Sequence, residues 1–274
     1  MFREAGLESP VIDSRLLVCH ALGIDRLDLL REPHRPLGAQ AEPLLAAAQR
    51  RLGHEPVSRI IGLRHFWGRP FAISPATLDP RADSETLVAA ALELAGPIQA
   101  HLKRPLRLLD LGTGSGCLLL TLLAELPDAT GIGSDISQAA IEVARRNAAA
   151  LGLAERVAFD CGHWGQGVAG QFDVIVSNPP YIRQADLDDL APDVARYDPV
   201  LALNGGADGL DSYREILATS VALAERGAIL FEVGQGQADD VQALLTQRFS
   251  GVGTGTAHRW RDLADIERVV GITL

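Results

Sequence analysis

The 274-residue sequence predicts an α/β protein in which a small helical module precedes a mainly parallel, doubly wound sheet. Three observations lead to this fold class. The first 55 residues carry helical apolar patterns separated by turn residues. From about Leu106, strand patterns alternate with helix patterns, which favours a parallel sheet with ligands beyond the strand C-termini. A composition of 47% hydrophobic and 22% charged residues provides ample material for a buried core.

Three helices are predicted in the N-terminal module. The first covers PVIDSRLLVCHAL, and Gly23 follows it as a stop. A short second helix is expected around Leu27–Leu30. A third is expected over Ala39–Leu52, where Arg50 and Arg51 place positive charge near the C-terminal end.

A β-hairpin is predicted next, in the segment HFWGRPFAIS. Its turn is expected at Gly68-Arg69-Pro70, and its aromatic residues are expected to pack in the core or between domains. Ser84 is a suitable N-cap for the helix that follows, because its hydroxyl can accept hydrogen bonds from the first backbone N–H groups. Gly96-Pro97 is expected to end that helix.

The remaining chain alternates between strands and helices. Helices are expected after the first two strands, around Ser212–Ala224 and around Ala238–Phe249. The predicted sheet edge brings together a glycine loop after the first strand, Asp135 after the second and Asn178–Tyr181 after the fourth. The strand patterns are LRLLDLG, GIGSDI, RVAFD, FDVIVSNPPY, AILFEVG, TAHRW and RVVGITL.

The glycine loop and Asp135 predict a nucleoside site. Glycines let residues 112–116 turn sharply and approach a ligand closely, because no Cβ intervenes. The helix that follows lacks the Lys-Ser/Thr pair of a phosphate-binding P-loop. Asp135, about 20 residues further on, is placed to accept hydrogen bonds from both hydroxyls of a ribose. A plain turn and a helix N-terminal charge are the alternatives; a phosphate-free adenosine-like ligand, with S-adenosylmethionine the obvious candidate, fits both features.

The tetrapeptide Asn178-Pro179-Pro180-Tyr181 predicts a site for a planar amino group. Two consecutive prolines fix φ and remove two N–H donors, so the turn is rigid and presents carbonyl acceptors. The Asn178 side-chain oxygen and the Pro179 carbonyl can each accept a hydrogen from a substrate –NH₂ and aim its nitrogen at an electrophilic methyl group, while Tyr181 packs on the flat group. The alternative is a proline turn beside an ordinary surface tyrosine.

Together these motifs resemble those of a known family. DLGTGSG, the Asp of SDIS and SNPPY are similar to the S-adenosylmethionine motifs of amino-methylating class I methyltransferases. Within that class, PRADSE, SNPPYI, LALNGGADGLDSYREI and FEVGQGQ resemble the release-factor protein-glutamine N5-methyltransferases, the PrmC or HemK family. The resemblance spans nearly the whole chain. It implies a Rossmann-like, mainly parallel seven-stranded sheet, a helical substrate-recognition domain at residues 1–62, a β-hairpin linker at 63–78 and a catalytic domain at 79–274.

The resemblance also implies a reaction and its residues. A methyl group would pass from S-adenosylmethionine, leaving S-adenosylhomocysteine, to the amide nitrogen of the glutamine in the GGQ motif of peptide chain release factors. Asn178, Pro179 and Tyr181 would be catalytic, and Pro180 would join them in binding the substrate. No metal or covalent intermediate is required. The cofactor would be held by Gly112, Thr113, Gly114, Ser115, Gly116, Asp135, Trp164 and Asn178.

The sequence departs from the family pattern near the expected site. Arg81 and Glu85 keep the ends of the family's PRPxTE segment. The departures bear on fine cofactor contacts and leave the reaction class unchanged. They are Asp79 for an apolar residue, Ala82 for Pro, Ser84 for Thr, His163 for an acidic residue and Asp198 for Glu.

Charge distribution limits the classes of partner. Residues 1–80 hold 10 Arg and 9 Asp or Glu, a net of +1, whereas residues 81–274 hold 15 basic and 26 acidic residues, a net of −11. Affinity for DNA comes mostly from Lys and Arg that neutralise phosphates, so a chain of net charge −10 is not expected to bind nucleic acid directly. The distribution agrees with a protein substrate.

Localisation and metal content follow from simple absences in the sequence. No apolar run approaches the about 18 residues of a membrane span, and MFREAGLESP lacks a signal peptide's apolar stretch. A cytoplasmic protein without a membrane partner is therefore expected. A monomer is the default expectation, because the sequence identifies no surplus apolar surface. The cysteines Cys19, Cys117 and Cys161 and the 7 histidines show no metal-ligand spacing, so no metal site is predicted.

Three other functions remain as alternatives. A ribosomal-protein glutamine N5-methyltransferase would share the cofactor loop and the NPPY tetrapeptide. An adenine-N6 nucleic-acid methyltransferase is more distant, because no nucleic-acid-binding module is recognisable. A non-enzymatic adenosine-nucleotide binding protein would leave NPPY without a purpose.

Overall fold

The computed structural model describes residues 1–219, 222–251 and 255–274. Its contacts divide the chain into two compact units. The helical unit comprises Met1–Leu63 and Leu190–Tyr197, and the sheet unit comprises Arg64–Asp189 and Asp198–Leu274.

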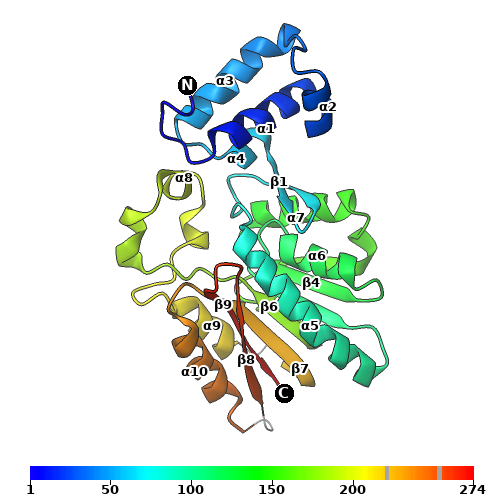
Figure 1. Cartoon of the computed structure of the whole chain (residues 1–274). Helices are drawn as coiled ribbons and strands as arrows, with labels where there is room; N and C mark the ends of the chain where they lie inside the picture. Colours follow the sequence, from blue (N-terminus) through cyan, green and yellow to red (C-terminus); the bar gives the residue numbers. More distant parts are fainter. Residues whose placement is uncertain (220–221, 252–254) are drawn as a thin grey trace. The chain divides into compact units, whose positions relative to one another are not determined.

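The helical unit confirms the three predicted helices. Gly23 ends the first of them with a φ of 63°, a left-handed conformation that glycine adopts without strain. The third begins two residues later than expected, because residues 38–40 form a 3₁₀ turn. The elements are α1 (Pro10–Leu22), α2 (Arg26–Arg31), η1 (Gly38–Gln40), α3 (Ala41–Leu52), α4 (Val57–Ile61) and, from the later segment, α8 (Pro192–Ala195) (Figure 1).

The segment 190–197 joins the helical unit from far along the chain. The Tyr197 hydroxyl donates to the Gly53 carbonyl at 3.1 Å, which ties this segment to the end of α3. The helical domain expected at residues 1–62 does not include this segment. Its contact with Gly53 joins residues 144 positions apart, and no local sequence pattern predicts such a contact.

The sheet unit is built on seven strands in the order β5-β4-β3-β6-β7-β9-β8. The first five in this order run parallel, and β9 pairs antiparallel with both β7 and β8. The predicted mainly parallel sheet is confirmed. The strands are β3 (Arg107–Leu111), β4 (Thr130–Asp135), β5 (Val157–Cys161), β6 (Gln171–Ser177), β7 (Ala222–Glu232), β8 (Thr256–Arg261) and β9 (Glu267–Thr273).

Helices cover both faces of this sheet (Figure 1). Alternating strand side chains feed two cores: Leu108 packs in the cluster with α5 and α6, and Leu109 in the cluster with α9 and α10. One face carries α5 (Glu85–Leu102), α6 (Cys117–Glu125) and α7 (Gln138–Ala150), and the other α9 (Asp211–Ala218) and α10 (Ala238–Phe249). Short 3₁₀ turns are η2 (Ala82–Ser84), η3 (Ala154–Arg156), η4 (Gln184–Asp189) and η5 (Val200–Ala202).

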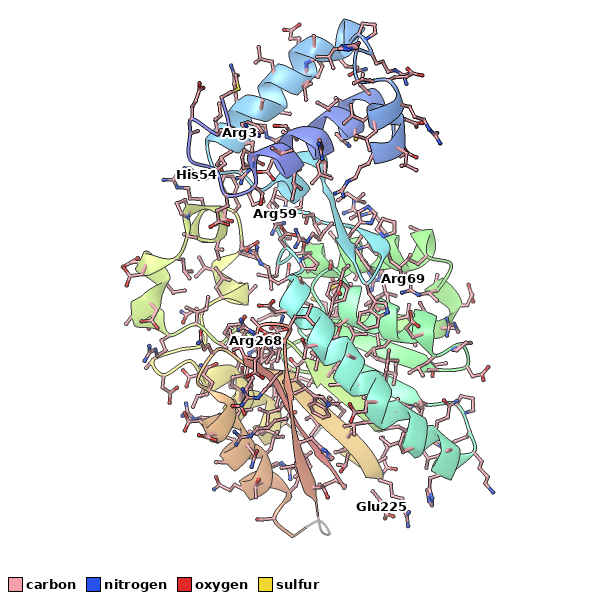
Figure 2. The ribbon with its side chains drawn as sticks, viewed as in Figure 1. Arg3, His54, Arg59, Arg69, Glu225 and Arg268 are labelled. Carbon is pink, nitrogen blue, oxygen red and sulfur yellow. The ribbon has the colours of Figure 1, made fainter. Side chains whose placement is uncertain are left out.

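The predicted hairpin is confirmed as β1 (Leu63–Phe66) and β2 (Arg69–Ala72), but its predicted turn is wrong. Trp67 and Gly68 make the turn, with φ values of 51° and 72°. Two residues with positive φ match the twist of the flanking strands, so Arg69 and Pro70 begin the second strand. Arg69, which is labelled in Figure 2, lies on this second strand. It pairs with Glu125 at 2.8 Å.

The predicted end of α5 at Gly96-Pro97 is also wrong, because the helix continues to Leu102. A proline inside a helix costs about 3 kcal/mol. Ile98, in the following turn, is 8% exposed in the core cluster, and its burial helps to offset that cost. Ser84 precedes the helix as predicted, yet its side chain makes no capping hydrogen bond.

The helix expected at Ser212–Ala224 ends at Ala218, so the later part of that prediction is wrong. Leu223 and Ala224 belong to β7, where Leu223 pairs with Phe172 of β6. Alanine and leucine favour helices locally, but pairing with a neighbouring strand overrides that weak preference. Residues 220–221 lie outside the described residues.

Among the described helices, none has the length and hydropathy that crossing a membrane requires.

Candidate active site

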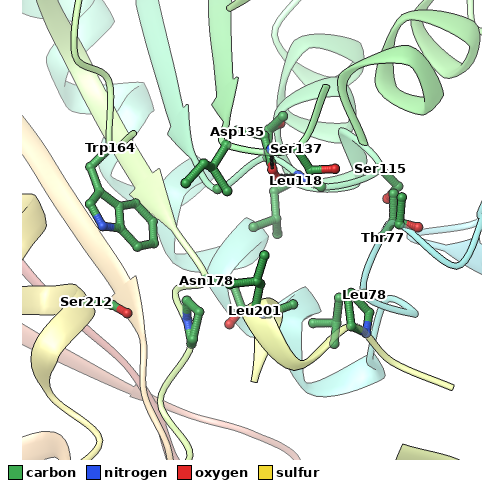
Figure 3. A pocket seen from close by; sticks show the side chains of 18 of the residues that line it. Thr77, Leu78, Ser115, Leu118, Asp135, Ser137, Trp164, Asn178, Leu201 and Ser212 are labelled. Atoms are coloured by element: carbon green, nitrogen blue, oxygen red, sulfur yellow. Dashed lines mark hydrogen bonds between the residues drawn. The ribbon is translucent and has the colours of Figure 1, made fainter. Parts of the chain in front are cut away.

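A pocket lies where the C-terminal ends of β3, β4 and β6 meet. Its cavity of about 340 Å³ is lined by the glycine loop, by Asp135, by Trp164 and by Asn178 (Figure 3). This edge is the usual ligand position in an open α/β sheet, and the volume is that of a small-molecule site. The structure thus brings the three segments predicted at this edge to one cavity.

The glycine loop needs its glycines for both conformation and space. Gly112 and Gly116 have φ values of 74° and 80°. A Cβ on Gly116 would lie 3.0 Å from Leu120 Cδ1, and one on Gly112 would lie 3.3 Å from the ring of Trp164. Residues 112–115 line the pocket, whereas Gly116 serves as the N-cap of α6.

Asp135 is fixed at the end of β4 by two backbone donors. Its carboxylate accepts from the N–H of Gly114 and from the N–H of Ser137, each at 2.8 Å. Burial raises the pKa of Asp135, and the two N–H groups oppose that shift. Each carboxylate oxygen retains a lone pair, so the side chain can accept from two further hydroxyls. A ribose with two adjacent hydroxyls fits this acceptor set.

Asp110 supports the loop from beneath. Its side chain is fully buried, and Oδ2 accepts from the Thr113 hydroxyl at 2.6 Å. Burial raises the pKa of Asp110 to about 7, with a hydrogen bond from Thr113 acting in the opposite direction. This contact holds Thr113, the second residue of the loop, against the end of β3.

Trp164 forms one wall of the pocket. It has a φ of 44°, and its Nε1 donates to Glu215 Oε2 at 2.7 Å. His163 packs edgewise on the indole with ring centroids 5.6 Å apart, and its Nε2 lies 3.5 Å from Glu215. His163, which departs from the family pattern, therefore shares the partner Glu215 with Trp164.

Asn178 and Pro180 of the NPPY turn line the pocket, whereas Pro179 is buried and is not among the described lining residues. An acceptor role for the Pro179 carbonyl stays a prediction. Asn178 Nδ2 donates to Ser84 Oγ at 3.2 Å. The amide oxygen of Asn178 is therefore the atom left to accept from a ligand.

Tyr181 is not among the described residues that line the cavity. Its hydroxyl lies 3.5 Å from Glu232 Oε1, and its carbonyl accepts from Gln237 Nε2 at 3.0 Å. Burial raises the pKa of Tyr181. Packing of this ring on a substrate stays a prediction.

Two acidic departures from the family pattern have basic partners. Asp79 lies 3.7 Å from Arg64, and Asp198 pairs with Arg81. Asp198 also accepts from the backbone N–H of Asp79 at 3.2 Å. These bonds fasten residues 79–81 to the start of the segment that lines the pocket at Pro199.

Sequence reasoning missed several residues at the site. Leu201, Ser212 and Glu215 line the pocket. Ser212 and Glu215 lie on α9, a helix that was predicted without any role in the site. Glu232 is 2% exposed at the end of β7, and an acidic residue inside the apolar run AILFEVG was the signal for it. In the part of the chain that the structure describes, no three His, Cys, Asp or Glu side chains gather as a metal-ligand set.

Asn147 was also missed. Its Nδ2 donates to the carbonyls of Ser115 and Ala72 at 2.8 and 3.0 Å, and its Oδ1 accepts from the Ala72 N–H at 2.8 Å. The buried amide thus ties the glycine loop to the hairpin. No local pattern marks it, since a lone Asn within a helix is ordinarily solvent-exposed.

Two family models match this chain: the PrmC N-terminal domain over residues 1–62 and the methyltransferase small domain over residues 93–194. A release factor glutamine methyltransferase of Rhodospirillum rubrum is 52% identical over 246 residues, covering 89% of this chain and 74% of that protein. One of Bradyrhizobium diazoefficiens is 48% identical over 246 residues, covering 89% and 82%. The chain belongs to the release factor glutamine methyltransferase family.

A solved structure supports the fold independently. The catalytic domain of hMettl16 in complex with a MAT2A 3′UTR hairpin superposes with a TM-score of 0.55 at 14% identity, covering 73% of this chain and 74% of that one. This likeness concerns the fold alone. Membership in the release factor glutamine methyltransferase family confirms the resemblance carried by DLGTGSG, SNPPY and FEVGQGQ.

Proposed function

We propose that this protein transfers a methyl group from S-adenosylmethionine to the side-chain amide nitrogen of the glutamine in the GGQ motif of peptide chain release factors. One observation carries the proposal within the family. Asn178, an acceptor for an amide –NH₂, lines the same cavity as the glycine loop and Asp135, so a cofactor and an amide would meet there.

The residues of the pocket fit the cofactor. S-adenosylmethionine supplies an electrophilic methyl group on a sulfonium. The backbone of residues 112–115 would lie along its methionine portion, since no Cβ projects from Gly112 or Gly114. Asp135 would accept from the ribose hydroxyls, and Trp164 would lie beside the adenine.

The NPPY turn would hold the amide substrate. An amide nitrogen is a weak nucleophile, because its lone pair is delocalised into the carbonyl. Asn178 Oδ1 and the Pro179 carbonyl would accept its two hydrogens, orient the nitrogen and stabilise the positive charge that develops on it. Orientation of this kind supplies roughly 7–11 kcal/mol of barrier reduction in favourable cases. The helical unit would help to bind the release factor, and a monomer in the cytoplasm is the expected form.

A methylation assay tests this function against its alternatives. The protein is incubated with labelled S-adenosylmethionine and, separately, with a release factor, the same factor with GGQ changed to GGA, a ribosomal protein fraction and DNA. Label is expected in the release factor alone and is expected to vanish in the GGA variant. Label that persists in that variant would refute the glutamine assignment. Label confined to the ribosomal fraction or to DNA would establish the corresponding alternative.

A further inference from the structure

Ser84 stands between Asn178 and a buried carboxylate, Glu232. Asn178 Nδ2 donates to Ser84 Oγ at 3.2 Å, and the Ser84 hydroxyl lies within reach of the Glu232 carboxyl, whose pKa it lowers as a hydrogen-bond donor. Ser84 is 4% and Glu232 2% exposed, so water has little access to either. Ser84 makes no capping hydrogen bond to α5, so its hydroxyl is available to Asn178 and Glu232.

The position of Glu232 is set by its neighbours. Its carbonyl accepts from the Tyr213 hydroxyl at 2.8 Å, and its Oε1 lies 3.5 Å from the Tyr181 hydroxyl. Arg268 at the start of β9 (Figure 2) acts on it electrostatically but pairs with Asp83 at 3.0 Å and with Asp262 at 2.8 Å. The Glu232 carboxylate therefore lies near the hydroxyls of Ser84 and Tyr181, while among the described residues its buried Oε2 has no hydrogen-bond partner and no cation pairs with it.

The sense of the hydrogen bonds at Ser84 follows from the carboxylate. An ionised carboxylate only accepts, so the single proton of Ser84 points to Glu232. The Ser84 oxygen can then only accept from Asn178, which turns Nδ2 toward Ser84 and leaves Oδ1 for the pocket. A protonated carboxyl, or the amide of Glu232→Gln, can itself donate to Ser84 Oγ. The Ser84 proton is then free to point to Oδ1, and the Asn178 amide can turn over. A turned amide would present N–H to a substrate –NH₂, a pair of donors with no acceptor.

We propose that Glu232 and Ser84 are positioning residues that fix the direction of the Asn178 amide, so that its oxygen faces the substrate nitrogen. The inference rests on the proposed function. It also accounts for two otherwise unexplained features: a carboxylate buried at the end of an apolar strand, and a serine that stands at a helix N-terminus without capping it.

Ionisation of Glu232 makes the orientation of the Asn178 amide sensitive to pH. Burial raises the pKa of Glu232 to about 7, while the Ser84 hydroxyl and the charge of Arg268 oppose the rise. Asp83 on η2, Tyr181 after β6, Tyr213 on α9 and Cys117 on α6 also face this group electrostatically. The aligned form of Asn178 is therefore expected to be lost as the pH falls below about 7.

The first test uses Ser84→Ala, Glu232→Gln and Ser84→Thr, with Glu267→Gln as the control. Glu267 lies on β9, where it pairs with Arg259 and Arg261, outside the pocket. At saturating release factor, Ser84→Ala and Glu232→Gln are expected to lower kcat about 10- to 100-fold with cofactor Kd within about threefold. Ser84→Thr, which keeps the hydroxyl, is expected to restore kcat to within about threefold of the wild type.

The second test is the pH profile, which a merely structural role would not move. Wild-type kcat is expected to fall on acidification through about pH 7, and this acid limb is expected to be absent in both Ser84→Ala and Glu232→Gln. Variants that match Glu267→Gln in kcat, or an acid limb that survives in Ser84→Ala, would overturn the inference. Wild-type protein that leaves the release factor unlabelled would instead refute the proposed function.

A third measurement needs no substrate. The side-chain amide resonances of Asn178, assigned by comparison with Asn178→Asp, are expected to shift with pH around 7 in the wild type and to stay constant in Ser84→Ala. If the chemical shifts of the Asn178 side-chain amide do not change with pH in the wild type, the inference is overturned, whichever substrate the enzyme methylates.

Discussion

Replacing Asn147 with alanine tests whether the glycine loop depends on a support from α7. The amide makes three hydrogen bonds, to the N–H and carbonyl of Ala72 and to the carbonyl of Ser115, and is 3% exposed. Each bond contributes about 0.5–1.5 kcal/mol net, so Asn147→Ala is expected to lower the free energy of unfolding by about 3 kcal/mol. Arg146→Ala, an exposed neighbour on the same helix, is expected to change it by less than about 0.5 kcal/mol.

Urea unfolding followed by tryptophan fluorescence measures this loss selectively. The 3 tryptophans, at positions 67, 164 and 260, all lie in the sheet unit, so their emission reports on that unit alone. Cofactor affinity is expected to fall together with stability, because the Ser115 carbonyl belongs to the loop that lines the pocket. An unfolding free energy for Asn147→Ala equal to that of Arg146→Ala would refute the reasoning.

Three further predictions concern the pocket. Asn178→Ala is expected to lower kcat about 100-fold with little effect on the cofactor Kd. Asp135→Ala is expected to raise the cofactor Kd, measured by calorimetry, at least about tenfold. Equal effects of the two variants on this Kd would contradict the assigned roles. Gly116→Ala is expected to destabilise the sheet unit by about 1–3 kcal/mol in urea, since a Cβ would meet Leu120 at 3.0 Å at a φ of 80°; unchanged stability would refute this. Burial raises the pKa of Asp110 from 3.8 to about 7, so its contribution to stability is full below pH 3.8 and is lost as the pH rises to about 7. Asp110→Asn is expected to remove this fall in the free energy of unfolding between pH 5 and pH 8, measured by urea titration at the two pH values. A fall of the same size in Asp110→Asn would exclude Asp110 as its cause.

The sheet was predictable because its strands alternate with helices and its two cores follow a two-residue period. Helix α10 begins and ends at the predicted residues. The hairpin turn was missed for a local reason, the positive φ of Trp67 and Gly68. In the helices, tertiary contacts outweighed local preference. Pro97 stays inside α5, where Ile98 in the next turn is buried, and Leu223 leaves its predicted helix because β6 offers it a partner. The segment 190–197 joined the helical unit through a contact that no local pattern records.

The site residues also divide into those that local sequence predicts and those that depend on tertiary contacts. Groups that act through the backbone were visible in sequence, because a glycine loop and a double proline restrict φ in ways that letters alone reveal. Groups that act through a neighbour were not. Ser84 has the residue type and position of an N-cap, and only its contact with Asn178 shows that its hydroxyl serves the pocket. A buried acid such as Glu232 costs free energy wherever it is placed, so its retention in an apolar strand is best explained by what it holds in position.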